Sequence, residues 1–151
     1  MSEERSVFMN LTVTENLRVG RVSSATCFSA FPELAGRANV RAGQLSGGEQ
    51  QMLTVGRALG RRPQILLADE LSLGLAPQVI ARLMTAIREA ADTQNVGALL
   101  VEQHVVHALG VADRFLIMRQ GRCVLEGAAS DYRGRIDAIQ RAYFGNVPSP
   151  G

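Results

Sequence analysis

The amino-acid sequence predicts an α/β fold, and three observations lead to that prediction. Two short apolar runs, at residues 65–68 and 98–101, have the length and composition of strands buried on both faces of a parallel sheet. Between them, apolar residues recur at helical spacing from 79 to 90, as in an amphipathic helix. A strand, a helix and a strand of these lengths form a right-handed βαβ unit, which brings the carboxyl ends of both strands to one sheet edge.

The composition is that of a folded domain. Of the 151 residues, 46% are hydrophobic and 20% are charged, which excludes disorder over the whole length and fits one modest domain or part of a larger one. No apolar run is long enough to cross a bilayer, and the chain opens on no charged-then-apolar leader. Cys27 and Cys123 lie far apart without companion ligands. We therefore expect a protein of the reducing cytoplasm, without disulfides, zinc clusters or membrane insertion.

The charge pattern excludes several chemistries. The net charge is +2, and all 16 basic residues are Arg, so the sequence contains no Lys. This absence rules out a lysine Schiff base, a Ser-Lys dyad and a phosphate-binding loop of the form G-x-x-x-x-G-K-[ST] within these residues. Because the Arg residues are spread along the chain, we expect no nucleic-acid surface.

The first elements are helical. Thr12 and Glu15 form a capping box, which predicts a short helix that ends at Gly20. The pattern from 21 to 43 is weak and allows a helical turn around Phe31 and Leu34.

A second capping box marks a longer helix. Ser46 and Glu49 cap a helix that runs to about Leu59, and Gly47 and Gly48 leave its first turn free of side chains. Open backbone N–H groups at a helix start, together with the helix dipole, suit a phosphate. The same residues also describe an ordinary capped helix with glycines in a tight turn.

Acidic residues follow the first predicted strand. Asp69 and Glu70 come directly after it, where open α/β sheets bind ligands and where a carboxylate can hold a metal or orient water. Two solvated loop acids would give the same pattern. His104 follows the second strand, so the βαβ geometry places it near both acids, although a lone histidine is more often a structural or surface residue than a catalytic one.

The C-terminal third contains a predicted hairpin and helix. Residues 115–118 and 123–126 flank a turn at 119–122, and residues 131–144 form a helix that points Ile136, Ile139 and Tyr143 inward. We expect the tail at 147–151 to be disordered.

Three motifs then point to one family. With L-S-G-G-E-Q-Q at 45–51, I-L-L-A-D-E at 65–70 and V-E-Q-H at 101–104, the chain resembles the ATPase domain of ABC transporters, a P-loop NTPase. They look like the ABC signature, the Walker B strand with its catalytic glutamate, and the switch histidine. Further segments, at 8–17, 31–34, 41–43 and 73–77, resemble the ATPase subunits of branched-chain amino-acid importers.

The resemblance implies ATP and Mg²⁺ as cofactors and a role for each motif residue. Asp69 would hold Mg²⁺, Glu70 would polarise the water that attacks the γ-phosphate, and His104 would contact that phosphate. The signature residues would reach ATP held by a second subunit in a head-to-tail dimer; they are Ser46, Gly47, Gly48 and Glu49.

The resemblance also implies an incomplete domain. The family's phosphate-binding loop lies N-terminal to every motif found here, and Glu3 aligns loosely with the family's Q-loop. We therefore expect the C-terminal part of the domain, an N-terminally truncated product in which residues 1–146 are a partial ATPase domain. Residues of about 7–60 would be its helical signature subdomain and about 61–144 its Walker B and switch-histidine half.

Two functions remain open at this point. The first is an ATP-hydrolysing importer subunit that pairs with a second ATPase subunit and with membrane permease subunits on the inner face of the cell membrane, inactive as a fragment because it has no Walker A lysine. The alternative is a non-catalytic interaction module, or an inactive truncated product, that keeps the signature and the dimerisation surface. DNA-repair and chromosome ATPases also carry a signature and a Walker B strand, but they need a long heptad coiled coil that this sequence lacks.

Overall fold

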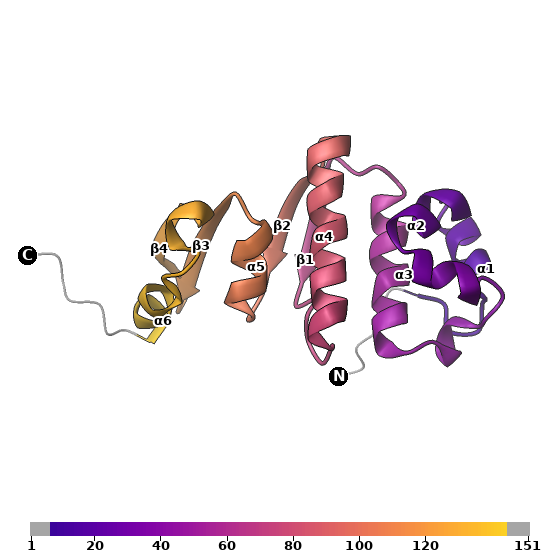
Figure 1. The fold of residues 1–151 in the computed structure, drawn as a ribbon, viewed down its shortest axis with the longest axis horizontal. Helices are drawn as coiled ribbons and strands as arrows, with labels where there is room; N and C mark the ends of the chain where they lie inside the picture. Colours follow the sequence, from indigo (N-terminus) through magenta and orange to yellow (C-terminus); the bar gives the residue numbers. More distant parts are fainter. Residues whose placement is uncertain (1–6, 145–151) are drawn as a thin grey trace, which may run out of the picture. The chain divides into compact units, whose positions relative to one another are not determined.

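The computed structural model describes residues 7–144 and divides the chain into two compact units, Met1–Val101 and Glu102–Gly151. Glu3 and the tail at 147–151 lie outside the described residues. Figure 1 shows the order of the elements along the chain. Residues 65–101 share one hydrophobic core with the preceding helices. The expected subdomains, about 7–60 and about 61–144, stay a prediction.

The first unit begins with helices. Helix α1 (Val13–Val19) starts at the predicted Thr12 capping box, and α3 (Gly47–Leu59) starts at the predicted Ser46 capping box. Between them, the segment with the weak sequence pattern forms one short α-helix, α2 (Ser24–Ala30), and two 3-10 helices, η1 (Pro32–Arg37) and η2 (Ala42–Gln44). Phe31 and Leu34 are fully buried there, because η1 turns both side chains into the core.

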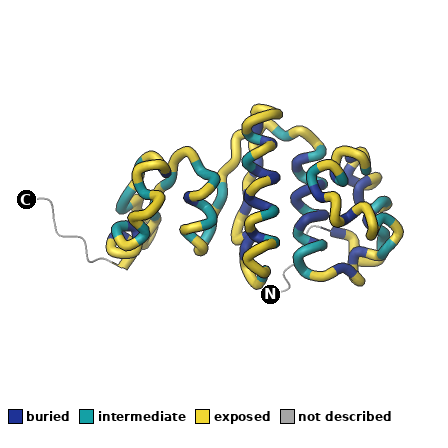
Figure 2. The backbone as a smooth tube through the Cα atoms, in the orientation of Figure 1, coloured by how far each residue is buried: buried dark blue, intermediate teal, exposed yellow. Residues whose placement is uncertain are grey.

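The βαβ unit is present in the first unit. Strand β1 (Ile65–Asp69) pairs in parallel with β2 (Gly97–Val101), and α4 (Pro77–Gln94) connects them. In Figure 2 the buried residues concentrate on α3 and α4. The buried residues of α4 recur at helical spacing, as predicted: Ile80, Leu83, Met84, Ala86, Ile87 and Ala90.

The prediction that the two strands are buried on both faces is wrong. Along β1, buried and exposed residues alternate, and β2 has no buried residue. Leu66 and Ala68 point into the core, whereas Ile65 and Leu67 are exposed. The reason is that the described helices cover one face of this two-stranded sheet.

The second unit contains α5 (Val105–Val111), the hairpin of β3 (Arg114–Arg119) and β4 (Arg122–Ala128), η3 (Ala129–Tyr132) and α6 (Ile136–Phe144). The hairpin confirms the prediction. Its two turn residues, Gln120 and Gly121, both have positive φ, the geometry that matches the strand twist in two-residue turns. The hydrophobic core of the second unit contains Leu109, Ala129 and Ile139.

The last helix is shorter than predicted. Residues 131–144 are not one helix, because the chain passes from η3 through Gly134, at φ +123°, before α6 begins at Ile136. Tyr143 is exposed rather than inward, and Ala142 is buried in its place, three residues after the buried Ile139. An i, i+3 stripe therefore faces the core, and the ring of Tyr143 lies outside it.

Candidate functional site

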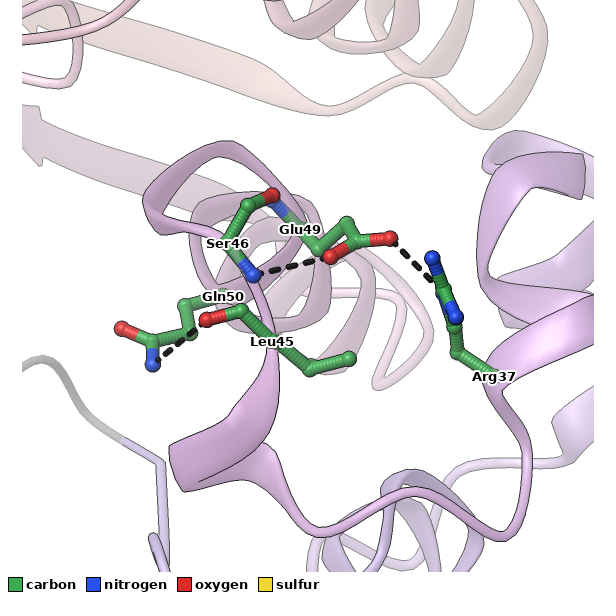
Figure 3. A network of polar contacts seen from close by, with 5 residues as sticks. All are labelled: Arg37, Leu45, Ser46, Glu49 and Gln50. Carbon is green, nitrogen blue, oxygen red and sulfur yellow. Dashed lines mark hydrogen bonds and ion pairs between the residues drawn. The ribbon is translucent and has the colours of Figure 1, made fainter.

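The start of α3 is held by reciprocal hydrogen bonds. The Oγ of Ser46 accepts from the backbone N–H of Glu49 at 3.2 Å, and the Glu49 carboxylate accepts from the backbone N–H of Ser46 at 2.8 Å (Figure 3). This satisfies two of the donors that a helix start leaves unpaired. The signature segment therefore has a defined backbone shape without any ligand.

Two residues that the sequence reasoning missed hold this segment. The Nε of Arg37 donates to the Glu49 carboxylate at 3.1 Å, and the buried side chain of Gln50 donates to the carbonyl of Leu45 at 3.3 Å (Figure 3). The Gln50 side chain also donates to the carbonyl of Ala42 at 2.9 Å. Gln50 thus clamps the loop before the helix to the helix itself. No pattern in the sequence predicts this contact, because the burial of the Gln50 amide, which makes partners necessary, depends on tertiary packing.

The charge of Glu49 is stabilised where it lies. The backbone hydrogen bond from Ser46 lowers the pKa of Glu49 below its usual value, the Ser46 and Arg37 side chains lower it further, and burial opposes these effects. An ionised Glu49 paired with Arg37 therefore lies at the positive end of the α3 dipole.

Packing of α3 against α4 explains the glycine at position 48. A Cβ on Gly48 would lie 3.0 Å and 3.1 Å from the two γ-carbons of Val79 on α4. Close packing of α3 against α4 therefore accounts for the small residue at 48. The sequence alternative, an ordinary capped helix with glycines in a tight turn, did not foresee this contact between helices.

The acids after β1 lie at the carboxyl edge of the sheet, as predicted. Asp69 ends β1, both acids are exposed, and the backbone N–H of Glu70 donates to the carbonyl of Val101 at 2.8 Å. This bond ties the ends of β1 and β2 together. Glu70 also has φ +49°, a left-handed conformation that costs an L residue roughly 1 kcal/mol or more.

A cleft of about 550 Å³ runs between α3 and β1. Asp69 and Glu70 line it, together with Arg57 of α3 and Arg61, which follows that helix. Residues 46–49 do not line this cleft. Within one chain the structure therefore brings Asp69 together with Glu70 and leaves the signature residues outside their cleft.

His104 lies in the second unit. It is the N-cap residue of α5, and its carbonyl accepts from the backbone N–H groups of His107, at 3.1 Å, and Ala108, at 3.3 Å. Its ring centroid is 6.4 Å from that of His107. The expected approach of His104 to Glu70 stays a prediction.

The side chains of the described residues indicate which metal ion could bind at this site. Across residues 7–144, no group of three or more His, Cys, Asp and Glu side chains could hold a metal ion by itself. Asp69 offers hard carboxylate oxygens, which suit Mg²⁺ when phosphate and water supply the other ligands.

No helix in the described part of the chain is long and apolar enough to cross a membrane.

Comparison with known proteins gives consistent matches. Residues 1–72 match the family model described as ABC transporter. The high-affinity branched-chain amino acid transport ATP-binding protein BraG of Pseudomonas aeruginosa is 44% identical over 138 residues, covering 84% of this chain and 59% of that protein. The probable branched-chain amino acid transport ATP-binding protein LivF of Archaeoglobus fulgidus is 36% identical, covering 83% of this chain and 57% of that protein.

Solved structures match in fold. A dimeric ATP-binding cassette in a post-hydrolysis state, bound to ADP and Pi, superimposes with a TM-score of 0.71 at 22% identity, covering 85% of this chain and 61% of that one. The fold is therefore that of part of an ATP-binding cassette. The chain spans about three fifths of the length of the relatives that it matches.

Proposed function

Since this chain is related in sequence and fold to the ATP-binding proteins of ABC transporters, we propose that it serves in the ATP-binding subunit of an importer of branched-chain amino acids. The observation that carries the proposal is the geometry of Glu70, which adopts φ +49° directly after β1 while its N–H is bonded to the end of β2. Strained residues held by surrounding structure concentrate at functional sites. An exposed carboxylate at this sheet edge suits work on a bound nucleotide.

Each acid has a separate role in the proposal. Asp69 holds Mg²⁺, and Glu70 orients the attacking water and accepts its proton. His104 donates to the γ-phosphate. When bound, Mg-ATP supplies the phosphoryl group that is transferred to water.

The signature residues act on a second subunit. Ser46, Gly47, Gly48 and Glu49 present the start of α3 to ATP held by an ATP-binding partner in a head-to-tail pair. Their place outside the cleft that contains Asp69 and Glu70 supports this assignment. Permease subunits at the inner face of the cell membrane couple the pair to solute movement, so the chain works as a peripheral cytoplasmic component.

A second candidate follows from the missing lysine. No phosphate-binding loop of the form G-x-x-x-x-G-K-[ST] occurs within the 151 residues. By themselves these residues then act as a non-catalytic module that completes the partner's ATP site without a complete site of their own.

The signature role is tested by ATP-dependent pairing. The 151-residue chain is mixed with the P. aeruginosa relative, and complex formation is measured by size-exclusion chromatography with and without Mg-ATP. We expect a complex only with Mg-ATP. Ser46→Asp should abolish it, because aspartate keeps the N-cap hydrogen bond but places a negative charge against the phosphate.

The matched control is Thr12→Asp, which makes the same kind of change at the capping box of α1. It should leave pairing unchanged. Pairing of the Ser46→Asp chain at the unmodified level would show that the start of α3 does not face nucleotide. Mg-ATP turnover by the 151-residue chain alone would favour the catalytic reading over the module.

A further inference from the structure

The two capping boxes of the first unit hold their glutamates in different ways. In the α1 box, the backbone N–H and the hydroxyl of Thr12 both donate to Oε2 of Glu15, at 2.7 Å and 2.9 Å. In the α3 box, the backbone N–H of Ser46 donates to Oε2 of Glu49 at 2.8 Å, and Oε1 accepts from the Nε of Arg37 at 3.1 Å (Figure 3). Bonds between Thr12 and Glu15 complete the α1 box, so capping does not explain the contact from Arg37.

The backbone that carries Arg37 is fixed by the core. Arg37 is the last residue of η1, in which Leu34 is fully buried, and its carbonyl accepts from the backbone N–H of Val40 at 2.8 Å. The side chains of Arg37 and Glu49 are 55% and 21% exposed. Ion pairs with this exposure contribute little to folding stability, so stability is a weak explanation for the pair.

The start of α3 contains opposing charges. A helix N-terminus has the equivalent of about +0.5 elementary charge, and an ionised Glu49 in the first turn adds a full negative charge. The backbone hydrogen bond from Ser46 lowers the pKa of Glu49, so the carboxylate stays ionised at neutral pH. By itself this carboxylate outweighs the dipole and repels an anion. With the guanidinium of Arg37 bound to it, the net charge at the helix start becomes positive.

We propose that Arg37 is a positioning residue that binds the Glu49 carboxylate and offsets its charge, so that the start of α3 accepts a phosphate of the nucleotide held by the partner subunit. The inference rests on the proposed function for that nucleotide. It adds to the signature a residue from outside the L-S-G-G-E-Q-Q segment. Arg37 acts through Glu49, and the pair sets the affinity of ATP-dependent pairing without being needed for α3 to form.

The first test measures how tightly the 151-residue chain binds the P. aeruginosa relative with Mg-ATP, by analytical ultracentrifugation. Arg37→Gln should weaken the complex about three- to tenfold, because the Glu49 carboxylate then lies near the phosphate without a counter-charge. The difference between the two chains should shrink as the salt concentration rises from about 0.05 M to about 0.5 M, since exposed charges are screened.

The decisive variant combines Arg37→Gln with Glu49→Gln. Gln at position 49 keeps the capping box, because its amide oxygen still accepts from the N–H of Ser46. Removing both charges should restore the affinity to within about twofold of the unmodified chain, since the two effects cancel. Glu49→Gln by itself should tighten the complex, because the charge of Arg37 is then no longer offset.

The matched control is Arg88→Gln, which breaks the ion pair with Asp92 on α4. Arg88 lies nine residues after Val79, the residue that faces Gly48, and therefore about 14 Å further along that helix. The control should leave the affinity unchanged. Urea denaturation without nucleotide should show that Arg37→Gln destabilises the chain no more than Arg88→Gln does.

Three results would overturn the inference. A double variant that binds as weakly as Arg37→Gln would show that Arg37 contacts the nucleotide directly. Weakening by Glu49→Gln, or a loss of stability in Arg37→Gln beyond that of the control, would show that the ion pair only shapes the segment. Unchanged affinity of Arg37→Gln would remove its role.

These results contradict the inference and leave the proposed function in place. Failure of the unmodified chain to form any complex with Mg-ATP contradicts the proposed function, and the inference falls with it.

Discussion

At the scale of single residues, backbone geometry distinguishes the two acids after β1. Asp69 is the last residue of a regular strand, whereas Glu70 leaves the strand with φ +49° and bonds its N–H to Val101. A glutamate in this conformation costs free energy that glycine would not cost. Its presence supports a role for the carboxylate, and the proposed role is to orient water.

Replacing Glu70 by Gln tests that role in a chain joined to the N-terminal segment of the P. aeruginosa relative. Gln keeps the size of the side chain but removes its charge, so ATP binding should survive and hydrolysis should fall by about 10² to 10⁴. The variant should accumulate as an ATP-dependent dimer on size-exclusion chromatography. Hydrolysis at the unmodified rate by a monomer would show that Glu70 is not the base.

The ionisation of Glu49 makes the stability of the folded chain depend on pH. Because the hydrogen bond from Ser46 lowers the pKa of Glu49 in the folded chain, its ionised form stabilises the fold at pH above the ordinary value of 4.5. That stability is lost as the pH falls through the lowered pKa. Glu49→Gln should therefore flatten the acid side of the stability profile, measured by urea denaturation at a series of pH values, and an unchanged profile would contradict this assignment.

At the scale of elements, glycines set how closely α2 approaches α3. A Cβ on Gly56 would lie 2.5 Å from the Sγ of Cys27 and 3.3 Å from a ring carbon of Phe31. Both side chains are buried, and burial raises the pKa of the Cys27 thiol to about 11, so it stays protonated at neutral pH.

Gly56→Ala should destabilise the chain by about 1–2 kcal/mol, because overpacking outweighs the better helix propensity of alanine. Adding Cys27→Ala removes the sulfur and should restore part of the loss. Gly110→Ala in α5, where a Cβ would meet nothing within 4 Å, is the control and should be neutral or stabilising. Equal effects of the two glycine substitutions in urea denaturation would rule out the steric explanation.

At the scale of the whole molecule, the proposed function assigns the 151 residues to two different nucleotide sites. Asp69 and Glu70 line one cleft, and the Ser46 helix start lies outside it. No lysine is available to contact the β- and γ-phosphates. In the proposed function, a complete nucleotide site includes a phosphate-binding loop from outside these residues and the signature residues of a partner.

Calorimetry with Mg-ATP should accordingly show no saturable binding to the 151-residue chain at low-micromolar concentrations. The same titration into the chain joined to the N-terminal segment of the P. aeruginosa relative provides the comparison and should show binding. Tight binding to the 151 residues alone would mean that they contain a phosphate site of another kind.

The sequence by itself determined the features that depend on a few neighbouring residues. The caps at Thr12 and Ser46 are three residues from their glutamates, and the turn at Gln120 needs two residues with positive φ, so each is encoded within four residues. The order of β1, α4 and β2 followed from the same local periodicity. Asp69 and Glu70 were placed correctly at the strand end for this reason.

Only the tertiary structure decided which faces of the elements are buried and which residue after β1 adopts a left-handed backbone conformation. The apolar run around Leu67 reads as a strand buried on both faces, but burial depends on distant segments, and here the described helices cover one face. Glu70 has its left-handed backbone where its N–H bonds to the end of β2, and the Gln50 side chain bonds to Ala42 in η2. Contacts between residues far apart in sequence have no local period, so no pattern along the chain could reveal them.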